Sequence, residues 1–303
     1  MIPVLLCVSL IVFCVSGSNT DTIVYQIAGG DATPEQVEQL KIELRLDGPI
    51  LIRYVRYMSN LLRGDLGKSY QSGEDVFGIF MGAFPLTIKV TFWSIVVSLV
   101  ISLPLGIISA LHRGSILDNI CSVFAFVGLA TPNFWLGLML IILFSAKLGW
   151  FPTGGYRDGF MSLVLPAITI GTGLTATVTR QTRASMLEVI RADYLRTARA
   201  KGVSETRVIL YHAMRNALIP IITVVGAQVA ACLAGSALTE TVFALPGVGR
   251  ILVNAINFND FTMVTGCILL QSIVTAFILL LVDLLYAFVD PRIKAQFAKG
   301  GKR

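Results

Sequence analysis

The hydrophobic positions of this sequence gather into long uninterrupted runs and do not alternate with polar ones. Six runs stand out, at about 2–16, 84–111, 119–146, 163–182, 216–238 and 265–289. The last five are long enough, as helices, to cross a hydrocarbon core of roughly 30 Å. Because a chain in lipid has to pair its backbone polar groups internally, and the runs are long, the pattern predicts an all-α integral membrane protein.

The first run has two interpretations. Fifteen helical residues reach only about 23 Å, and the small residues of Val15-Ser16-Gly17 would suit the end of a signal peptide. A signal peptide, however, begins with basic residues, and the first basic residue here is Lys41. We expect residues 1–17 to form a first transmembrane helix whose cytoplasmic lead-in is short or missing from this start.

The composition narrows the class of protein further. Hydrophobic residues make up 55% of the 303 positions and charged residues only 14%, with a mean hydropathy of +0.76. Soluble domains carry about 25% charged residues, so a soluble enzyme and a disordered chain are both excluded. The five cysteines lie in or beside apolar runs without a C-x-x-C pair, as expected of small packing residues.

The charge distribution predicts an orientation with both termini in the cytoplasm. With six spans, the cytoplasmic segments hold 14 Lys/Arg against 5 Asp/Glu, and the external segments hold 9 against 12. The cytoplasmic segments are then 112–118, 180–215 and 290–303, and the external ones are 18–83, 147–164 and 239–264. This is the basic excess that the positive-inside rule requires. The net charge of +6 therefore reflects topology and gives no indication of nucleic-acid binding.

The external segment 18–83 is too long for a simple connection and is expected to fold. Thr33, Pro34 and Gln36 have the pattern of a helix start with a capping box. An amphipathic helix follows, whose apolar stripe consists of Leu51, Val55, Met58 and Leu62. That stripe either packs on the rim of the bundle or forms part of a platform for an external partner.

Signals of catalysis are weak throughout the chain. The segment 64–69 resembles the end of a phosphate-binding loop, but the glycine that should open the motif is replaced by Leu62. The two histidines, His112 and His212, belong to no metal-binding motif, and no nucleophile elbow is present. We expect no catalytic residue, no metal site and no cofactor on this chain. Lys89 and Asp283 are the ionisable residues within the spans, too few for an ion relay.

Small residues recur every four positions in the fifth run, at Gly226, Ala230 and Ala234. Such spacing lets helices approach closely in lipid, either within one bundle or against a second membrane subunit. A neighbouring stripe repeats the spacing at Ala227, Ala231 and Gly235. Prolines that can kink or end spans are Pro85, Pro104, Pro132, Pro166 and Pro220.

The most informative segment is the basic stretch between the fourth and fifth runs. A short helix is expected from about 192 to 201, ending at Gly202 in a left-handed cap, with Ser204 starting a second helix that enters the fifth run. A basic helix held outside the membrane suits insertion into a groove of another protein. Lying on anionic headgroups is the alternative.

The segment 191–202, Arg-Ala-Asp-Tyr-Leu-Arg-Thr-Ala-Arg-Ala-Lys-Gly, resembles the coupling loop of the permease subunits of ABC importers, most closely the dipeptide/oligopeptide/nickel family. Matching motifs elsewhere are 64–69, 131–135, 148–152, 239–243, 246–250 and 290–292. Where the general coupling pattern has Glu-Ala-Ala, this chain has Arg196-Thr197-Ala198, a form typical of the peptide subfamily. The long external loop after the first span resembles that of the first permease of the pair.

The resemblance implies a type I ABC importer permease fold with six transmembrane helices. It divides the chain into a first helix at 1–17, an external loop at 18–83, and a five-helix transmembrane domain at 84–303 with the coupling loop at 183–215. A cytoplasmic coupling helix between helices 4 and 5 would contact the ATPase. Its implied contact residues are Asp193, Tyr194, Arg196, Thr197, Ala198, Arg199, Ala200, Lys201 and Gly202.

The implied function is a transport subunit, not an enzyme, of an importer for dipeptides or oligopeptides in a bacterial or archaeal cytoplasmic membrane. The alternative cargo is nickel, a metal chelate or a glutathione-type peptide. The implied partners are a second homologous permease, two ATPase subunits that carry ATP and Mg, an external substrate-binding protein and the lipid bilayer. The pathway would alternate between outward and inward access as ATP binds and is hydrolysed.

Overall fold

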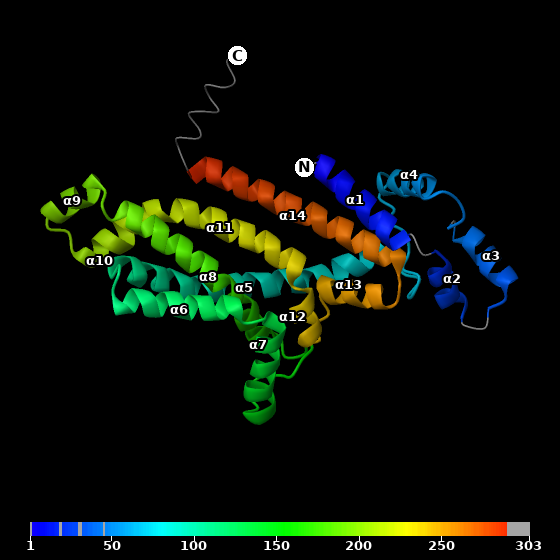
Figure 1. Cartoon of the computed structure of the whole chain (residues 1–303), viewed down its shortest axis with the longest axis horizontal. Coiled ribbons are helices and arrows are strands. Elements are labelled where there is room, and N and C mark those ends of the chain that lie inside the picture. The colour runs from blue at the N-terminus through cyan, green and yellow to red at the C-terminus, as the bar shows by residue number, and fades with distance from the viewer. Residues whose placement is uncertain (1, 18–19, 30–31, 45, 290–303) are drawn as a thin grey trace, which may run out of the picture.

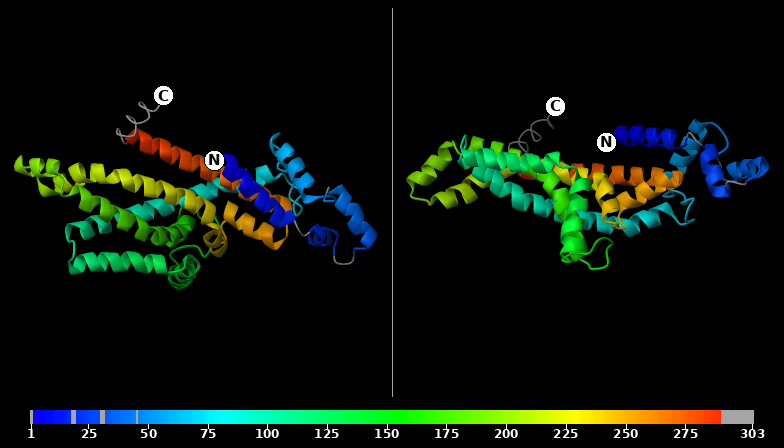
Figure 2. Two further views of the ribbon diagram at one scale, coloured as in Figure 1. Left: turned by 45° about the horizontal axis from the view of Figure 1, so that its top comes forward. Right: turned by 60° about the horizontal axis from the view of Figure 1, so that its bottom comes forward.

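The computed structural model describes residues 2–17, 20–29, 32–44 and 46–289. Within these ranges the chain is helical and has no named strand, only an isolated antiparallel bridge between Lys68 and Asp75. The all-α prediction is confirmed for this part of the chain. The long helices run roughly along the longest axis of the molecule in Figure 1 and Figure 2.

Four of the described helices are long and apolar enough to cross a membrane. They are α5 (Val76–Leu111), α8 (Met161–Val189), a helix from Glu205 that includes α11 (Met214–Gly235), and α14 (Phe261–Val289). They contain the second, fourth, fifth and sixth apolar runs of the sequence. Each of them begins or ends outside its run. The largest differences are that α5 starts inside the predicted 18–83 loop, that α8 extends seven residues past 182, and that the helix from Glu205 starts well before 216.

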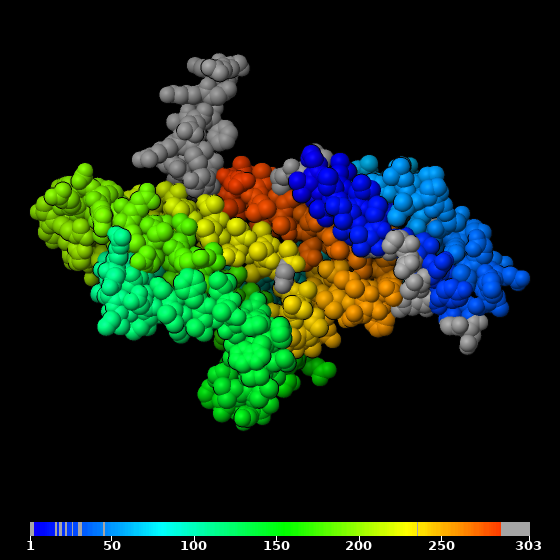
Figure 3. Space-filling model, viewed as in Figure 1, coloured from blue at the N-terminus to red at the C-terminus, as the bar shows by residue number. Residues whose placement is uncertain are grey.

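The third predicted span is not one straight helix, which corrects the sequence-based expectation. The structure has α6 (Ile116–Ala130), then α7 (Asn133–Leu140) continuing as a π-helical segment (Ile141–Lys147), and the two parts are bent by 95°. Pro132 has no N–H to donate, and a residue before proline avoids the helical region. Thr131 accordingly has an extended backbone, with ψ of 121°. Figure 3 shows the α7 arm standing out from the body.

The first apolar run forms α1 (Ile2–Gly17), which is shorter than the four long helices. It packs along the start of α14. Phe13 is buried there and makes edge contacts with Phe261 and Tyr54, with ring centroids 5.1 and 5.5 Å apart. The six expected spans therefore appear as four long helices, one sharply bent pair and one short apolar helix.

The segment after α1 folds into three helices, α2 (Thr20–Ala28), α3 (Pro34–Glu43) and α4 (Ile50–Leu61). The predicted capping box of α3 is confirmed, because Thr33 and Gln36 each accept a hydrogen bond from the other's backbone N–H. In Figure 1 these helices lie at one end of the molecule.

The predicted helix α4 is present, and most of its apolar stripe is exposed. Leu51, Val55 and Leu62 are exposed, at 65%, 63% and 85%. Arg53 is buried instead, with its guanidinium over the rings of Phe13 and Phe261 and its Nη1 donating to the carbonyl of Gly17. Cation–π contact and that hydrogen bond compensate for burying the charge.

The centre of the fold is the pair α5 and α8, which pack against each other more extensively than any other described pair. Two glycines make the close approach possible. A Cβ on Gly106 would lie 2.5 Å from Thr182, and a Cβ on Gly171 would lie 2.7 Å from the carbonyl oxygen of Ser94. The two helices therefore meet along small residues, as helices in lipid commonly do.

Two short helices, α12 (Ala237–Val242) and α13 (Val248–Asn257), connect α11 to α14. They are joined by the buried carboxylate of Glu240, which accepts hydrogen bonds from the hydroxyls of Thr87 and Ser236 and from the backbone N–H of Arg250. Gly247 lies directly against this carboxylate, where a Cβ would come within 2.4 Å of it.

The segment that resembles a phosphate-binding loop is a structural turn. The backbone N–H of Gly67 donates to Asp65, and the hydroxyl of Ser69 donates to the buried carboxylate of Asp260. Asp260 also accepts from the N–H of Met263 in the first turn of α14. The turn therefore fastens the start of α5 to the start of α14.

Candidate coupling site

The short helix predicted from about 192 to 201 is present as α9 (Asp193–Ala200), which stands at the opposite end of the molecule from α2 and α3 (Figure 1). Asp193 lies in its first turn and Arg199 in its last, so both charges complement the helix dipole. No side chain caps the N-terminus, where Ala192 occupies the cap position. The stability of so short a helix must therefore come from its C-terminal cap and its packing.

The helix ends in a Schellman motif, and Gly202 has the left-handed backbone predicted for it, with φ of +76°. The N–H of Gly202 donates to the carbonyl of Arg199 at 2.9 Å, and the N–H of Val203 donates to that of Ala198 at 3.3 Å. Val203 and Ala198 also pack on the same apolar cluster. These are the two hydrogen bonds and the apolar contact of the motif.

The buried side chain of α9 that anchors the helix to the body of the protein is Leu195. Leu195 has 0% exposure and belongs to a buried cluster with Ala110 of α5 and Met186 of α8. The rest of the cluster lies at the start of the next helix, at Val208, Ala213 and Ala217. Movement of α9 would therefore press directly on α5, α8 and α11. Leu195 was not predicted as an anchoring residue, although a leucine among charged residues was the available signal.

Two polar contacts strengthen this attachment. Arg199 donates from Nε and Nη2 to the two carboxylate oxygens of Glu205, at 3.0 and 2.8 Å. These hydrogen bonds raise the pKa of the Arg199 guanidinium above its usual value. The amide of Asn216 donates to the hydroxyl of Tyr194 at 2.9 Å, which links α9 to α11. Both contacts are solvent-accessible, so each contributes modestly to stability.

The outer surface of α9 is polar and largely exposed. Of the expected contact residues, Ala198 and Arg199 are half-buried, and the exposed ones are Asp193, Tyr194, Arg196, Thr197, Ala200, Lys201 and Gly202. The side chains of Asp193 and Arg196 are 98% and 80% exposed, and their charged groups are 3.9 Å apart. The exposed residues thus present a largely polar surface with three charged side chains, Asp193, Arg196 and Lys201.

The second helix of the segment differs in detail from its prediction. Ser204 occupies the N-cap position but makes no side-chain capping bond. The helix starts as α10 (Glu205–Arg207), widens into a π-helical segment (Val208–Ala213), and continues into α11. The widened turn includes Val208 and Ala213, which both face the Leu195 cluster. A π-turn at this point is consistent with a functional position.

The small-residue stripe of α11 lies partly within the chain. Gly226 is buried, and a Cβ on it would lie 2.4 Å from Val282 of α14. Ala230 is also buried, whereas Ala234 is exposed. The structure thus uses Gly226 for packing inside this chain, and it leaves Ala227 and Ala231 exposed beside it.

The described part of the chain holds no group of three or more His, Cys, Asp and Glu side chains arranged to bind a metal ion. His112 contacts the carbonyl of Ile108 at 3.1 Å through Nδ1, and His212 packs edge-on against Tyr211. Both contacts are local and structural. The features described in this part of the chain are therefore the exposed surface of α9 and the packed helices to which α9 is attached.

Known structures share this fold. The chain resembles the membrane subunit in an inward-facing structure of the MetNI methionine ABC transporter, with a TM-score of 0.59 at 21% identity, covering 70% of this chain and 96% of that one. A structure titled as an amino acid ABC transporter with histidines gives a TM-score of 0.52. At these identities the likeness establishes the fold, that of an ABC importer permease.

Sequence relatives extend over nearly the whole chain. The "Di/tripeptide transport system permease protein DppB" of Pseudomonas aeruginosa is 40% identical over 290 residues, covering 87% of this chain and 86% of that protein. The "Dipeptide transport system permease protein DppB" of Escherichia coli K12 is 36% identical, and the "Glutathione transport system permease protein GsiC" of another E. coli strain is 39% identical. Each of these two alignments covers 97% of this chain and 96% of the relative.

Two family models divide the sequence between them. The N-terminal membrane component of binding-protein-dependent transport systems matches residues 1–91, and the model described as "Binding-protein-dependent transport system inner membrane component" matches residues 102–295. The second match alone covers more than half of the chain and contains α9 with its attachments. The chain therefore belongs to the family of inner membrane components of binding-protein-dependent transport systems.

Proposed function

We propose that this chain is a permease subunit that passes dipeptides or oligopeptides from an external binding protein to the cytoplasm. The observation that carries the proposal is the similarity over nearly the whole chain to permeases named for dipeptide and tripeptide transport. The chain is a transport subunit and not an enzyme, and ATP hydrolysis belongs to separate subunits that also hold Mg. The geometry of α9 supports an attachment to such a subunit.

The proposed topology has six membrane crossings with both termini in the cytoplasm. α1 is the first crossing and the bent α6–α7 pair is the third, while the four long helices provide the others. The basic excess of the segments 112–118, 180–215 and 290–303 supports this orientation. It puts α9 in the cytoplasm and helices α2 to α4 outside, and these elements lie at opposite ends of the molecule (Figure 1).

The proposed assembly contains a second, homologous permease, two ATPase subunits and an external binding protein. This chain is the first permease of the pair, since a folded segment of three helices follows α1. Closure of the ATPase pair on ATP displaces α9, and Leu195 transmits the displacement to α5, α8 and α11 through the cluster that it enters. Hydrolysis allows the return, which gives alternating access.

Glutathione is the second candidate cargo, because GsiC of E. coli is as similar as the dipeptide permeases. Glutathione is itself a tripeptide, so the same pathway chemistry serves both. Nickel or a metal chelate is the third candidate of the wider family. Specificity among these cargoes is expected to depend mainly on the binding protein.

The test is ligand uptake by the assembled transporter in proteoliposomes with its binding protein. A panel of dipeptides, tripeptides, glutathione and Ni²⁺ should show ATP-dependent uptake of short peptides. Uptake of Ni²⁺ without peptides would overturn the cargo but keep the coupling role. In parallel, R196E on the exposed surface of α9 should reduce co-purification of the ATPase, whereas R56E on exposed α4 should not. Equal co-purification of both variants would contradict the role of α9.

A further inference from the structure

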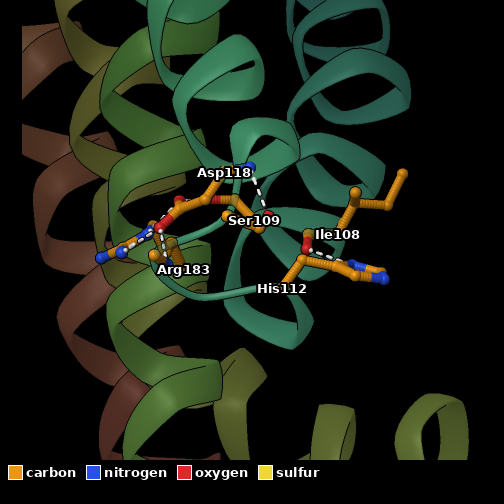
Figure 4. A network of polar contacts seen from close by, with 7 residues as sticks. Ile108, Ser109, His112, Asp118 and Arg183 are labelled. Atoms are coloured by element: carbon orange, nitrogen blue, oxygen red, sulfur yellow. Dashed lines mark hydrogen bonds and ion pairs between the residues drawn. The ribbon is translucent and has the colours of Figure 1, made fainter.

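A carboxylate near the coupling end of the molecule receives an unusual number of hydrogen bonds. Asp118, in the first turn of α6, is 5% exposed. Arg183 of α8 donates to it from Nε at 2.9 Å and from Nη2 at 2.8 Å, one bond to each oxygen. The hydroxyl of Ser109 and the backbone N–H of Gly114 also donate to it, as Figure 4 shows in part. We call the Asp118–Arg183 contact the clamp.

The clamp joins parts of the chain that are far apart in sequence. Asp118 and Ser109 belong to the two sides of the α5–α6 turn, and Gly114, with φ of +77°, lies within that turn. Arg183 comes from α8, 65 residues beyond Asp118. The contact between the guanidinium and the carboxylate is bidentate, so it fixes the relative orientation of the two side chains as well as their distance. The α5–α6 turn is thereby held to one position along α8.

The position of the clamp is related to that of α9. Ala110 follows Ser109 on α5, and Met186 lies one turn after Arg183 on α8. Ala110 and Met186 belong to the buried cluster that Leu195 of α9 enters. The clamp, which joins α6 to α8, therefore lies beside the apolar cluster, next to Ala110 on α5 through Ser109 and next to Met186 on α8 through Arg183. A push on Leu195 reaches α5 and α8 at the level where the clamp fixes α6 to them.

The exposure of the two partners indicates more than a surface ion pair. The Asp118 side chain is only 7% exposed, and that of Arg183 is 32% exposed. Removing one partner would leave a buried charge unpaired, whereas removing both charges together is tolerated far better. The neighbouring basic groups make other contacts or face outward: Arg180 lies over the ring of Phe126, and Arg113 is exposed. Arg183 is thus the guanidinium assigned to this carboxylate.

We infer that Asp118 and Arg183 are positioning residues that make the α5–α6 turn move together with α8 when the ATPase displaces α9. The inference rests on the proposed coupling role of α9 and extends it to the third span. Without the clamp, α8 follows α9 while α6 and its bent continuation α7 do not. ATP hydrolysis then proceeds with less cargo moved for each ATP.

Hydrogen exchange on the assembled transporter, with and without ATP and vanadate, tests the inference directly. In the wild type, ATP should change exchange at both 193–203 and 112–118. In the double variant D118N/R183Q, which leaves no unpaired charge, the change at 193–203 should persist and that at 112–118 should be lost. A matched control is K41Q, which breaks the external Lys41–Asp21 pair of 2.6 Å and should leave both responses intact.

The outcomes separate the inference from the proposed function. An undiminished response at 112–118 in the double variant, or no response there in the wild type, would overturn the clamp while the coupling role stands. No response at 193–203 in the wild type would overturn the coupling role and the clamp with it. The amount of cargo taken up per ATP hydrolysed gives a second readout. This ratio should fall about fivefold or more in the double variant, with the ATPase subunits still bound. An unchanged ratio would mean that the clamp is only a structural contact.

Discussion

The left-handed cap at Gly202 offers the sharpest perturbation of α9, because its cost can be separated from steric clashes. A Cβ added to Gly202 meets no atom within 4 Å, so G202A introduces no collision. What remains is the penalty for an L-residue at φ of +76°, about 1–2 kcal/mol. That penalty reduces the population of the capped end by a factor of about 5–30. G202N should be milder, since asparagine tolerates this region better.

The assay is ATPase stimulation by liganded binding protein in proteoliposomes, titrated with ATPase subunits. G202A should weaken the apparent affinity for those subunits, with G202N intermediate and membrane insertion normal. Gly73 provides the matched control, because it has φ of +74°, also has nothing within 4 Å, and lies in the turn before α5. G73A imposes the same backbone penalty far from α9. If G202A matched the wild type, or if G73A weakened the affinity equally, the reasoning about the cap would be refuted.

Three further perturbations follow from packing. L195A removes a side chain with 0% exposure and should destabilise the attachment of α9 by about 2–5 kcal/mol. Trypsin should then cut near α9 faster in a limited digestion. An unchanged rate of cutting would contradict the anchoring role of Leu195. G247A places a Cβ 2.4 Å from the Glu240 carboxylate and should lower the free energy of unfolding by about 1–3 kcal/mol. The Tm of the protein in detergent should therefore fall. An unchanged Tm would mean that this contact does not hold α12 and α13 together. G226L should disrupt packing against Val282 and lower the Tm even of the isolated chain; an effect confined to the assembled transporter would instead place this residue at a subunit interface.

Local signals in the sequence were sufficient for the elements that depend on local chemistry. The capping box at Thr33 and the left-handed Gly202 were both predicted, because each needs only a few neighbouring residues. The four long helices were predicted from continuous apolar runs. The ends of these helices were predicted less accurately, because a helix can continue beyond its apolar part. One example is α8, which extends through polar residues to Val189.

The failures have physical causes that a sequence pattern does not carry. From the sequence, the break at Pro132 could have been either a slight kink within one span or a sharp bend. The angle of 95° between α6 and the helix that follows it is a property of the tertiary structure. The burial of Arg53 on α4 was not predicted, because two aromatic rings from α1 and α14 make the buried site that receives it. Which rings would meet that guanidinium is set by tertiary packing.

The candidate coupling site contains both predicted and unpredicted features. Its helix and its left-handed cap were predicted from neighbouring residues, whereas the anchoring cluster and the clamp were not. Asp118 and Arg183 are 65 residues apart, and each was counted only as one more cytoplasmic charge. Nothing in their separate neighbourhoods indicates that they pair. Only the close packing of α5 with α8, made possible by glycines such as Gly106, brings the α5–α6 turn to that arginine.

Site-specific photo-crosslinking in membranes that contain the whole transporter tests the central claim most directly. A photoreactive residue placed at the exposed position of Arg196 on α9 should crosslink to an ATPase subunit, and the yield should change when ATP is trapped. The same residue at the exposed position of Arg56 on α4 should give no ATPase adduct. An ATPase adduct from position 56, or none from position 196, would contradict the assignment of α9 as the coupling helix.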